Sequence, residues 1–251
     1  MRVVFFEYQR FLKWLVICFS LVAVAVTGYG LVEYRSTLPA IKNYEPIYQG
    51  DAGTKKVALI CNVVWGEEFL PEMLQTLRQQ DAKITFFVGG QWAEQYPELT
   101  EMLDREGHEI GNHGYAHLHP TRISQEENIR EIQKTEDILK KITGKQTKLF
   151  HPPYREIDDN TAKIAAEQGY RTIMSSIDTI DWQRPAPEVI VERVVPKIHN
   201  GAIILMHPTD PTAKALPTMI AQLKAKGYVF TTVSDLLKES SSKKSETPIK
   251  P

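Results

Sequence analysis

The stretch Gly201-Ala-Ile-Ile-Leu-Met-His207 is an uninterrupted apolar run that ends in an imidazole. Short apolar runs rich in branched residues are typical of strands that are buried on both faces. Seven such runs occur along the chain, at 57–62, 84–88, 108–111, 149–151, 171–175, 202–206 and 229–233. Amphipathic segments separate these runs. The alternation predicts an α/β fold in which about seven parallel strands form a sheet or a barrel.

Two of the intervening segments have clear helical signals. Residues 124–142 begin with Ser124-x-x-Glu127, which is a capping box, and end just before Gly144. Residues 215–226 place apolar side chains on one face and end before a glycine. Both segments are expected to cover the sheet.

The composition excludes several classes of protein. The chain has 251 residues, with 30 Lys and Arg against 31 Asp and Glu, and a formal net charge of −1. This balance argues against a nucleic-acid partner, because nucleic-acid-binding domains normally carry a basic face. Two cysteines cannot form a disulfide scaffold, and 42% apolar residues fit neither a disordered chain nor a multi-span membrane protein.

Residues 14–32 contain no charged side chain, and their length matches the hydrocarbon thickness of a bilayer. We therefore expect a transmembrane anchor at 14–32, and a cytoplasmic N-terminus at 1–13 because Arg2, Arg10 and Lys13 precede the apolar run. The protein would then be a single-pass protein of the cell membrane with an extracytoplasmic body. A signal peptide cleaved after Ala23-Val-Ala25 is the alternative, and it would give a secreted protein.

The remaining segments divide the chain further. Residues 33–55 show no periodicity and contain two prolines and two glycines, so we expect a spacer there. The polar residues 240–251 are expected to form a disordered tail. The working domain is therefore predicted to span residues 56–239.

Reactive side chains follow the predicted strands at the points where these end. His113 and His117 follow the third strand, Asp181 follows the fifth and His207 ends the sixth. The segment His151-Pro-Pro-Tyr154 follows the fourth. Because the carboxyl ends of parallel strands meet at one end of a barrel, this order predicts a single site.

The spacing of His113 and His117 suits metal binding, since residues four apart on a helical turn point the same way. The alternative is a pair of surface or core histidines. His207 could be a general acid or base, with Asp181 orienting its ring, or it could simply cap a strand. The residues alone leave these alternatives open.

Six segments occur in an order that resembles the polysaccharide deacetylases with a NodB-homology domain, the fourth carbohydrate esterase family. The resemblance covers residues 56–239, and the first motif together with the membrane anchor is most similar to the branch found in spore-forming bacteria. The segments are KKVALICNVVWGEE (55–68), ITFFVGGQWAEQYPE (84–98), HEIGNHGYAH (108–117), FHPPYREID (150–158), SSIDTIDW (175–182) and the segment 201–228 from GAIILMHP onward.

The resemblance implies a distorted (β/α) barrel that removes N-acetyl groups from peptidoglycan or a chitin-like polymer, with a role in sporulation. It also implies a bound divalent metal ion, with zinc expected first and cobalt, nickel or manganese as alternatives. Carried over residue by residue, the metal ligands would be His113 and His117, the general acid His207 and its partner Asp181. The acetyl pocket would be lined by Trp182 and Leu205, and Tyr154 would lie in the groove with its backbone N–H near the developing oxyanion.

The chain departs from the family pattern at two places. The first motif of the family usually reads Thr-Phe-Asp-Asp-Gly, whereas residues 60–65 read Ile-Cys-Asn-Val-Val-Trp. The family arginine that steadies the base aspartate is replaced by His151. Asn62, Glu67, Glu68 or His151 could supply a replacement base or ligand. Alternatively, Glu67 and Glu68 open a helix, where acidic residues are favourable.

Two functional hypotheses follow from these departures. The chain is either a metal-dependent deacetylase with a remodelled site, or an inactive deacetylase-like domain that binds cell-wall glycan or a partner. A hydrolase with a cysteine nucleophile does not fit, because Cys61 lies in an apolar strand where a thiol is inert.

Overall fold

The computed structural model describes residues 11–17, 20 and 44–244, with side chains described as far as residue 238. The chain divides into two units, residues 1–42 and residues 43–251. In the first unit, residues 11–17 and 20 are helical. No helix within the described residues is both long and apolar enough to cross a bilayer. Most of the predicted anchor at 14–32 lies outside the described residues, so the anchor stays a prediction.

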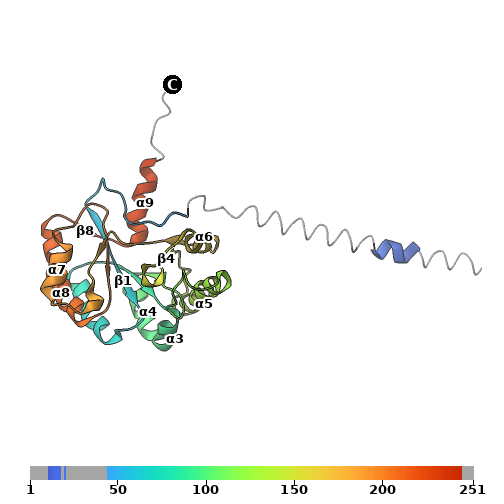
Figure 1. The fold of residues 1–251 in the computed structure, drawn as a ribbon, viewed down its shortest axis with the longest axis horizontal. Coiled ribbons are helices and arrows are strands. Elements are labelled where there is room, and N and C mark those ends of the chain that lie inside the picture. The colour runs from blue at the N-terminus through green and yellow to red at the C-terminus, as the bar shows by residue number, and fades with distance from the viewer. Residues whose placement is uncertain (1–10, 18–19, 21–43, 245–251) are drawn as a thin grey trace, which may run out of the picture. The chain divides into compact units, whose positions relative to one another are not determined.

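The second unit is built on a sheet of eight parallel strands that curves into an open barrel (Figure 1). The strand order is β5-β4-β3-β2-β1-β7-β6, and β8 pairs with the beginning of β1. The strands are β1 (Lys56–Val63), β2 (Thr85–Val88), β3 (Glu109–Asn112), β4 (Leu149–Phe150), β5 (Arg171–Thr172), β6 (Ile177–Asp178), β7 (Ile203–Met206) and β8 (Val229–Phe230). The predicted α/β class with parallel strands is confirmed.

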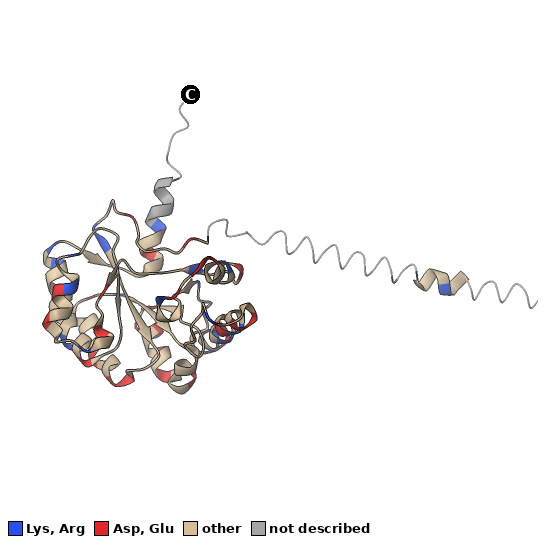
Figure 2. Ribbon diagram, viewed as in Figure 1, with Lys and Arg blue, Asp and Glu red and all other residues tan. Residues whose placement is uncertain are grey.

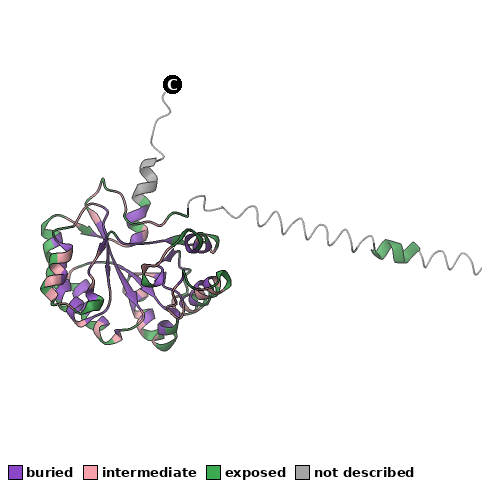
Figure 3. Cartoon of the chain, in the orientation of Figure 1, coloured by how far each residue is buried: buried purple, intermediate pink, exposed green. Residues whose placement is uncertain are grey.

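Helices surround the sheet, and Figure 3 shows their inner faces buried and their outer faces exposed. Many of the charged residues lie on the helices that surround the sheet (Figure 2). The α-helices are α2 (Leu70–Gln79), α3 (Gly90–Gln95), α4 (Pro97–Arg105), α5 (Gln125–Thr143), α6 (Asp159–Glu167), α7 (Pro187–Val194), α8 (Asp210–Ala225) and α9 (Val233–Lys244). Three short 3-10 helices complete the set: η1 (Glu67–Phe69), η2 (Pro153–Arg155) and η3 (Asp181–Gln183).

The ends of α5 follow the signals in the sequence. The Ser124 hydroxyl accepts a hydrogen bond from the Glu127 backbone N–H at 3.1 Å, and Gly144 adopts the left-handed conformation at the C-terminal end. The helix predicted at 215–226 begins five residues earlier than expected. Thr209 caps α8 at its N-terminus, and Pro217 lies inside the helix.

The inside of the barrel is filled partly by the C-terminal helix. Val233, Leu236 and Leu237 of α9 pack against apolar side chains of β1, β2, β4 and β7. The Thr85 hydroxyl fixes the start of α9 by accepting a hydrogen bond from the Val233 N–H at 2.9 Å. Since α9 continues to Lys244, it extends into the tail that was predicted from residue 240.

Residues 47–50 form a strap across the opening between the two edges of the sheet. The Ile47 N–H donates to the Thr172 carbonyl at 2.9 Å, and the Gly50 N–H donates to the Gly201 carbonyl at 2.8 Å. A side chain at position 50 would meet Leu236 of α9 at 2.5 Å, so a glycine is required there. The end of the segment that we expected to be a spacer, residues 33–55, thus packs with the domain.

Candidate functional site

A cavity of about 560 Å³ opens at the carboxyl ends of the strands, where the sequence predicted a site. Its lining brings together residues from the loops after β1, β3, β4, β6 and β7. These are Asn62, Val64, Trp65, His117, Tyr154, Arg155, Asp178, Trp182, Leu205 and His207. The predicted residues His113, His151 and Asp181 lie directly behind this lining.

His207 and Asp181 form a hydrogen-bonded pair. The Nδ1 of His207 lies 2.8 Å from Oδ1 of Asp181, and the His207 backbone N–H donates to Oδ2 at 2.6 Å. Asp181 is fully buried, and its Oδ2 also accepts from the Thr212 hydroxyl at 2.6 Å. Because the carboxylate accepts the Nδ1 proton, the ring presents Nε2 as its free nitrogen. The pair can therefore hold a proton at a defined atom of His207.

His113, His117 and His151 form a cluster of imidazoles beside the cavity. The ring centroids of His113 and His117 are 5.1 Å apart, and those of His113 and His151 are 5.4 Å apart. Burial lowers the pKa of His117 to about 4 and that of His151 to about 3. Burial also lowers the pKa of His113 well below its usual range. The cluster is therefore uncharged at neutral pH.

Asn62 and His151 face each other at the cavity floor. The side-chain nitrogen of Asn62 lies 3.2 Å from Nδ1 of His151, and both residues are buried. Val64 also lines the cavity, whereas Val63 is fully buried in the core between the sheet and its helices. The two first-motif positions that face the cavity therefore carry an amide and an aliphatic group.

The donor atoms do not fit a catalytic metal centre. Within the described residues, no three His, Cys, Asp or Glu side chains lie close enough to hold a metal ion. The remaining polar side chain at the cavity floor is Asn62, whose amide nitrogen lies 3.2 Å from His151 and whose amide oxygen would be only a neutral, weak ligand. Catalytic zinc sites usually have three protein ligands and an open position. We therefore derive no reaction step through a metal.

Glu67 and Glu68 do not reach the cavity. Glu67 accepts hydrogen bonds from the Tyr96 hydroxyl at 2.8 Å and from the Trp92 indole N–H at 3.4 Å, and Glu68 is exposed. Both residues lie in the first turn of η1. The structure thus places them at a helix start, which was the alternative to a replacement base or ligand.

The aromatic and apolar residues predicted to bind substrate all line the cavity. Leu205 is buried at its floor, while Tyr154 and Trp182 are 52% and 56% exposed, as suits contact with a ligand. Tyr154 stacks on His119, with ring centroids 3.8 Å apart and planes within 8°. His119 therefore supports the Tyr154 side of the groove by packing.

Four lining residues, Val64, Trp65, Arg155 and Asp178, were not among the predicted candidates. Trp65 stacks parallel to the His207 ring, with centroids 5.8 Å apart. Arg155 donates to Asp178 at 2.9 Å across the cavity wall. Trp65 could have been found from the sequence, because it comes directly after the altered first motif. No sequence pattern indicated that Arg155 pairs with Asp178, because the two residues are distant in sequence.

Several residues around the cavity adopt left-handed backbone conformations that non-glycine residues seldom use. His117 has φ of 54°, Tyr154 of 57° and Ile180 of 53°. For a β-branched residue such as Ile180 this is a true outlier, and it is held by the Asp178 carboxylate, which accepts from the Ile180 N–H at 2.8 Å. Such strain persists only where the surrounding structure enforces it.

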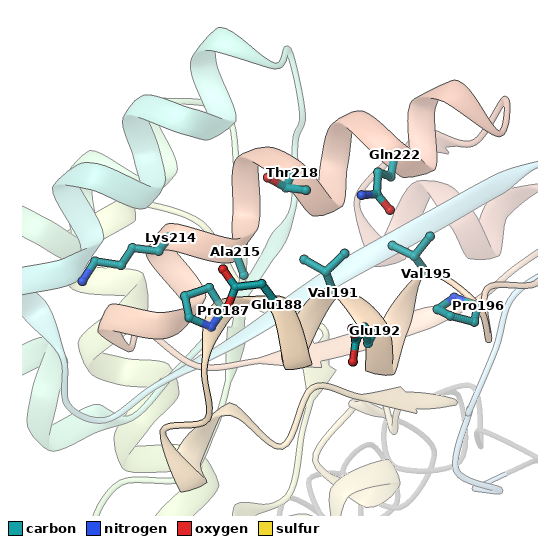
Figure 4. Close-up of a pocket in the computed structure, with 10 residues that line it drawn as sticks. All are labelled: Pro187, Glu188, Val191, Glu192, Val195, Pro196, Lys214, Ala215, Thr218 and Gln222. Carbon is teal, nitrogen blue, oxygen red and sulfur yellow. The ribbon is translucent and has the colours of Figure 1, made fainter.

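A second, separate pocket of about 330 Å³ lies on the flank of the barrel between α7 and α8 (Figure 4). Val191, Val195 and Ala215 contribute apolar groups, and Glu188 and Glu192 are on its α7 side. None of the predicted site residues lines this pocket. The chemistry predicted from the sequence is therefore confined to the cavity at the strand ends.

The fold and the cavity together define a (β/α)-barrel domain of the carbohydrate esterase type. The chain belongs to the polysaccharide deacetylase family, whose sequence model matches residues 49–173. A peptidoglycan-N-acetylglucosamine deacetylase of Bacillus cereus is 34% identical over 209 residues, which cover 81% of this chain and 76% of that protein. The uncharacterized protein YlxY of Bacillus subtilis is 43% identical over 196 residues, covering 78% of this chain and 61% of YlxY. The chain therefore spans about three fifths of that relative.

Solved structures give the same family. Wild-type BA3943, a CE4 family pseudoenzyme from Bacillus anthracis, has a TM-score of 0.76 and 41% identity, covering 77% of this chain and 69% of that chain. A mutant of BA3943 with restored enzymatic activity has the same TM-score and 40% identity, covering 77% and 71%. The similar proteins thus include both a peptidoglycan-N-acetylglucosamine deacetylase and a pseudoenzyme.

Proposed function

We propose that this domain binds N-acetylated cell-wall glycan in the cavity at the strand ends and does not hydrolyse it. The observation that carries the proposal is the contact of Asn62 with His151 at 3.2 Å. His151 occupies the place of the arginine that steadies the base aspartate in the family, and its partner here is an amide. An amide cannot take a proton from water, and a general base works best when its pKa is near the operating pH. The pKa of His151, about 3, is far from that range.

The cavity itself supports glycan binding. Tyr154 and Trp182 expose aromatic faces, and Leu205 supplies an apolar floor. Aromatic side chains with a polar edge are well suited to ligands that have apolar faces and hydroxyl groups. The similarity to peptidoglycan deacetylases supports an N-acetylated glycan as the ligand class, and the similarity to a CE4 pseudoenzyme supports loss of turnover.

Metal-dependent deacetylation is the second candidate function, and two observations favour it. The Asp181–His207 pair is intact. His113 donates its Nδ1–H to the His151 carbonyl at 2.6 Å, which leaves Nε2 buried without a partner. Fixing one ring nitrogen in this way is how metal-binding histidines are commonly oriented. Against this candidate stand the absent base and the absent third ligand.

One set of measurements on the full-length chain separates the two candidates. We expect no stoichiometric metal by mass spectrometry, no acetate released from soluble peptidoglycan, and retention of the protein on insoluble peptidoglycan. Acetate release that is lost on chelation and in His207→Ala would instead establish the deacetylase.

A double variant tests whether only the lost carboxylates prevent turnover. Asn62→Asp with Val64→Asp places carboxylates at the two first-motif positions that line the cavity. We expect this variant to bind a divalent metal and to release acetate, because it adds a carboxylate ligand and a base to the cavity. Adding His207→Ala is the matched control and should abolish the gained activity.

A further inference from the structure

We propose that Trp65 and Trp182 form an aromatic clamp on either side of His207, and that the clamp holds a neutral N-acetylated sugar. This inference rests on the proposed function and specifies how the ligand is held. Trp65 comes from the altered first motif, so the segment that lost its carboxylates would have gained a binding residue.

The order of the strands places the two indoles. Trp65 follows β1, His207 follows β7, and Trp182 lies in η3, directly after β6. In the sheet β7 lies between β1 and β6. The loop that carries His207 therefore lies between the segments that carry the two tryptophans, and all three side chains line the cavity.

The backbone around Trp65 is fixed by a close approach to the loop after β7. Gly66 has φ of +84°, and a Cβ atom there would lie 2.1 Å from the Pro208 carbonyl oxygen. Only glycine allows this contact. Beside this contact, the Trp65 ring lies parallel to the His207 ring, with centroids 5.8 Å apart and an interplanar angle of 9°. Trp65 is nevertheless 37% exposed, so its indole is available to a ligand.

The charges of the cavity favour a neutral ligand. Two lining residues, Arg155 and Asp178, carry full charges, and they neutralise each other at 2.9 Å. The carboxylate behind His207 is likewise paired, at 2.8 Å. A ligand with a free amine or carboxylate would find no unpaired partner among these groups and would lose solvation on entering. An N-acetylated sugar has apolar ring faces and neutral hydrogen-bonding groups, which match the clamp.

Isothermal titration of the full-length chain tests the clamp. The ligands are the tetramer of N-acetylglucosamine and its fully deacetylated counterpart. We expect Trp65→Ala to raise the Kd for the acetylated tetramer about tenfold, which corresponds to about 1.4 kcal/mol. Trp65→Phe keeps an aromatic face and should raise it less than about threefold. Tyr48→Ala removes an exposed aromatic ring of the strap segment, outside the cavity lining, and should leave the Kd unchanged.

The outcomes distinguish this inference from the proposed function. If the wild-type chain does not bind the acetylated tetramer, the proposed function is wrong, and the clamp with it. If Trp65→Ala unfolds at the same temperature as wild type and binds with the same Kd, only the clamp is wrong. Equal affinity for the deacetylated tetramer would overturn the assignment of a neutral ligand.

Discussion

At the scale of single residues, the best-defined feature is the buried carboxylate of Asp181. It is fully buried and accepts hydrogen bonds from the His207 N–H, the His207 ring and the Thr212 hydroxyl. A buried charge is tolerated only when it is paired and hydrogen-bonded. Thr212, in the first turn of α8, supplies one of these hydrogen bonds. The Asp181–His207 pair therefore depends on a residue that does not line the cavity.

Thr212→Val removes the hydroxyl and keeps the shape of the side chain. We expect the free energy of unfolding to fall by about 1–2 kcal/mol, because the Asp181 carboxylate loses one of its donors. Urea denaturation measures the change. Thr218→Val, at an exposed position of the same helix, is the matched control and should change stability by less than about 0.5 kcal/mol. Equal effects of the two variants would show that the hydrogen bond to Asp181 contributes nothing.

The sequence predicted that reactive side chains gather at the strand ends. Asp181 lies beside His207 because it follows β6, which pairs with β7, whereas the sequence placed it after the run 171–175, which begins as β5 at the far edge of the sheet. The stacking of His119 on Tyr154 could not be predicted, because it depends on the left-handed backbone of Tyr154. No local pattern around a proline-rich turn indicates that conformation.

At the scale of elements, the loop after β1 and the loop after β7 are locked together. Gly66 approaches the Pro208 carbonyl so closely that a Cβ atom at position 66 would lie 2.1 Å from its oxygen. The position of the loop that carries Trp65 is therefore linked to the position of the loop that carries His207. A change in either loop should alter both side chains.

Gly66→Ala tests this coupling. The new methyl group would both require a left-handed alanine and collide with the Pro208 carbonyl at 2.1 Å. Gly144→Ala, at the end of α5, is the matched control, since its φ is +72° but no atom lies within 4 Å. We expect about 1–2 kcal/mol of destabilisation at Gly144 from the backbone alone, and a clearly larger loss at Gly66. Similar losses in urea denaturation would mean that the loop after β1 yields freely.

The missed elements have physical causes. Strand β6 has two residues, Ile177 and Asp178, and a pair of residues has no periodicity to detect. The predicted start at residue 215 put Pro217 in the first turn, where a proline is tolerated, whereas the structure has it inside the helix. In the structure Thr209 and Pro211 give the helix an ordinary beginning upstream of that proline.

At the scale of the whole molecule, the barrel is completed by segments from both ends of the chain. Strap residues 47–50 bridge the open edges, and α9 fills the interior. Neither role could be predicted locally, because the strap has no strand periodicity and makes its contacts with residues more than a hundred positions away. The repeated strand–helix pattern, in contrast, indicated the parallel sheet directly.

The stability of the whole domain should depend on pH through its buried histidines. Burial lowers the pKa of His108 to about 4, and this residue is remote from the cavity lining. Between about pH 6.5 and 4 the unfolded chain protonates this ring while the folded chain does not. Stability therefore falls as the pH falls through that range, by about 1.4 kcal/mol per pH unit for one such group.

His108→Gln keeps an acceptor for the Ile84 N–H, which lies 3.3 Å from Nδ1 of His108, and removes the titration. The variant should lose stability less steeply than wild type between pH 6.5 and 4, as measured by urea denaturation at several pH values. Parallel curves for the two proteins would show that His108 is already protonated in the folded state.

The neutral cavity floor has a consequence for the conditions under which the protein can work. Asn62 and Val64 carry no charge, and the imidazoles beside them are uncharged at neutral pH. The cavity floor therefore has no cluster of like charges whose repulsion a bound cation would have to balance in the folded state. If the cavity binds its ligand without a metal, as we propose, the domain should unfold at the same temperature with and without a chelator, whereas proteins that need a metal lose their shape or activity when it is withdrawn. On that proposal the barrel would keep its form in zinc-starved surroundings.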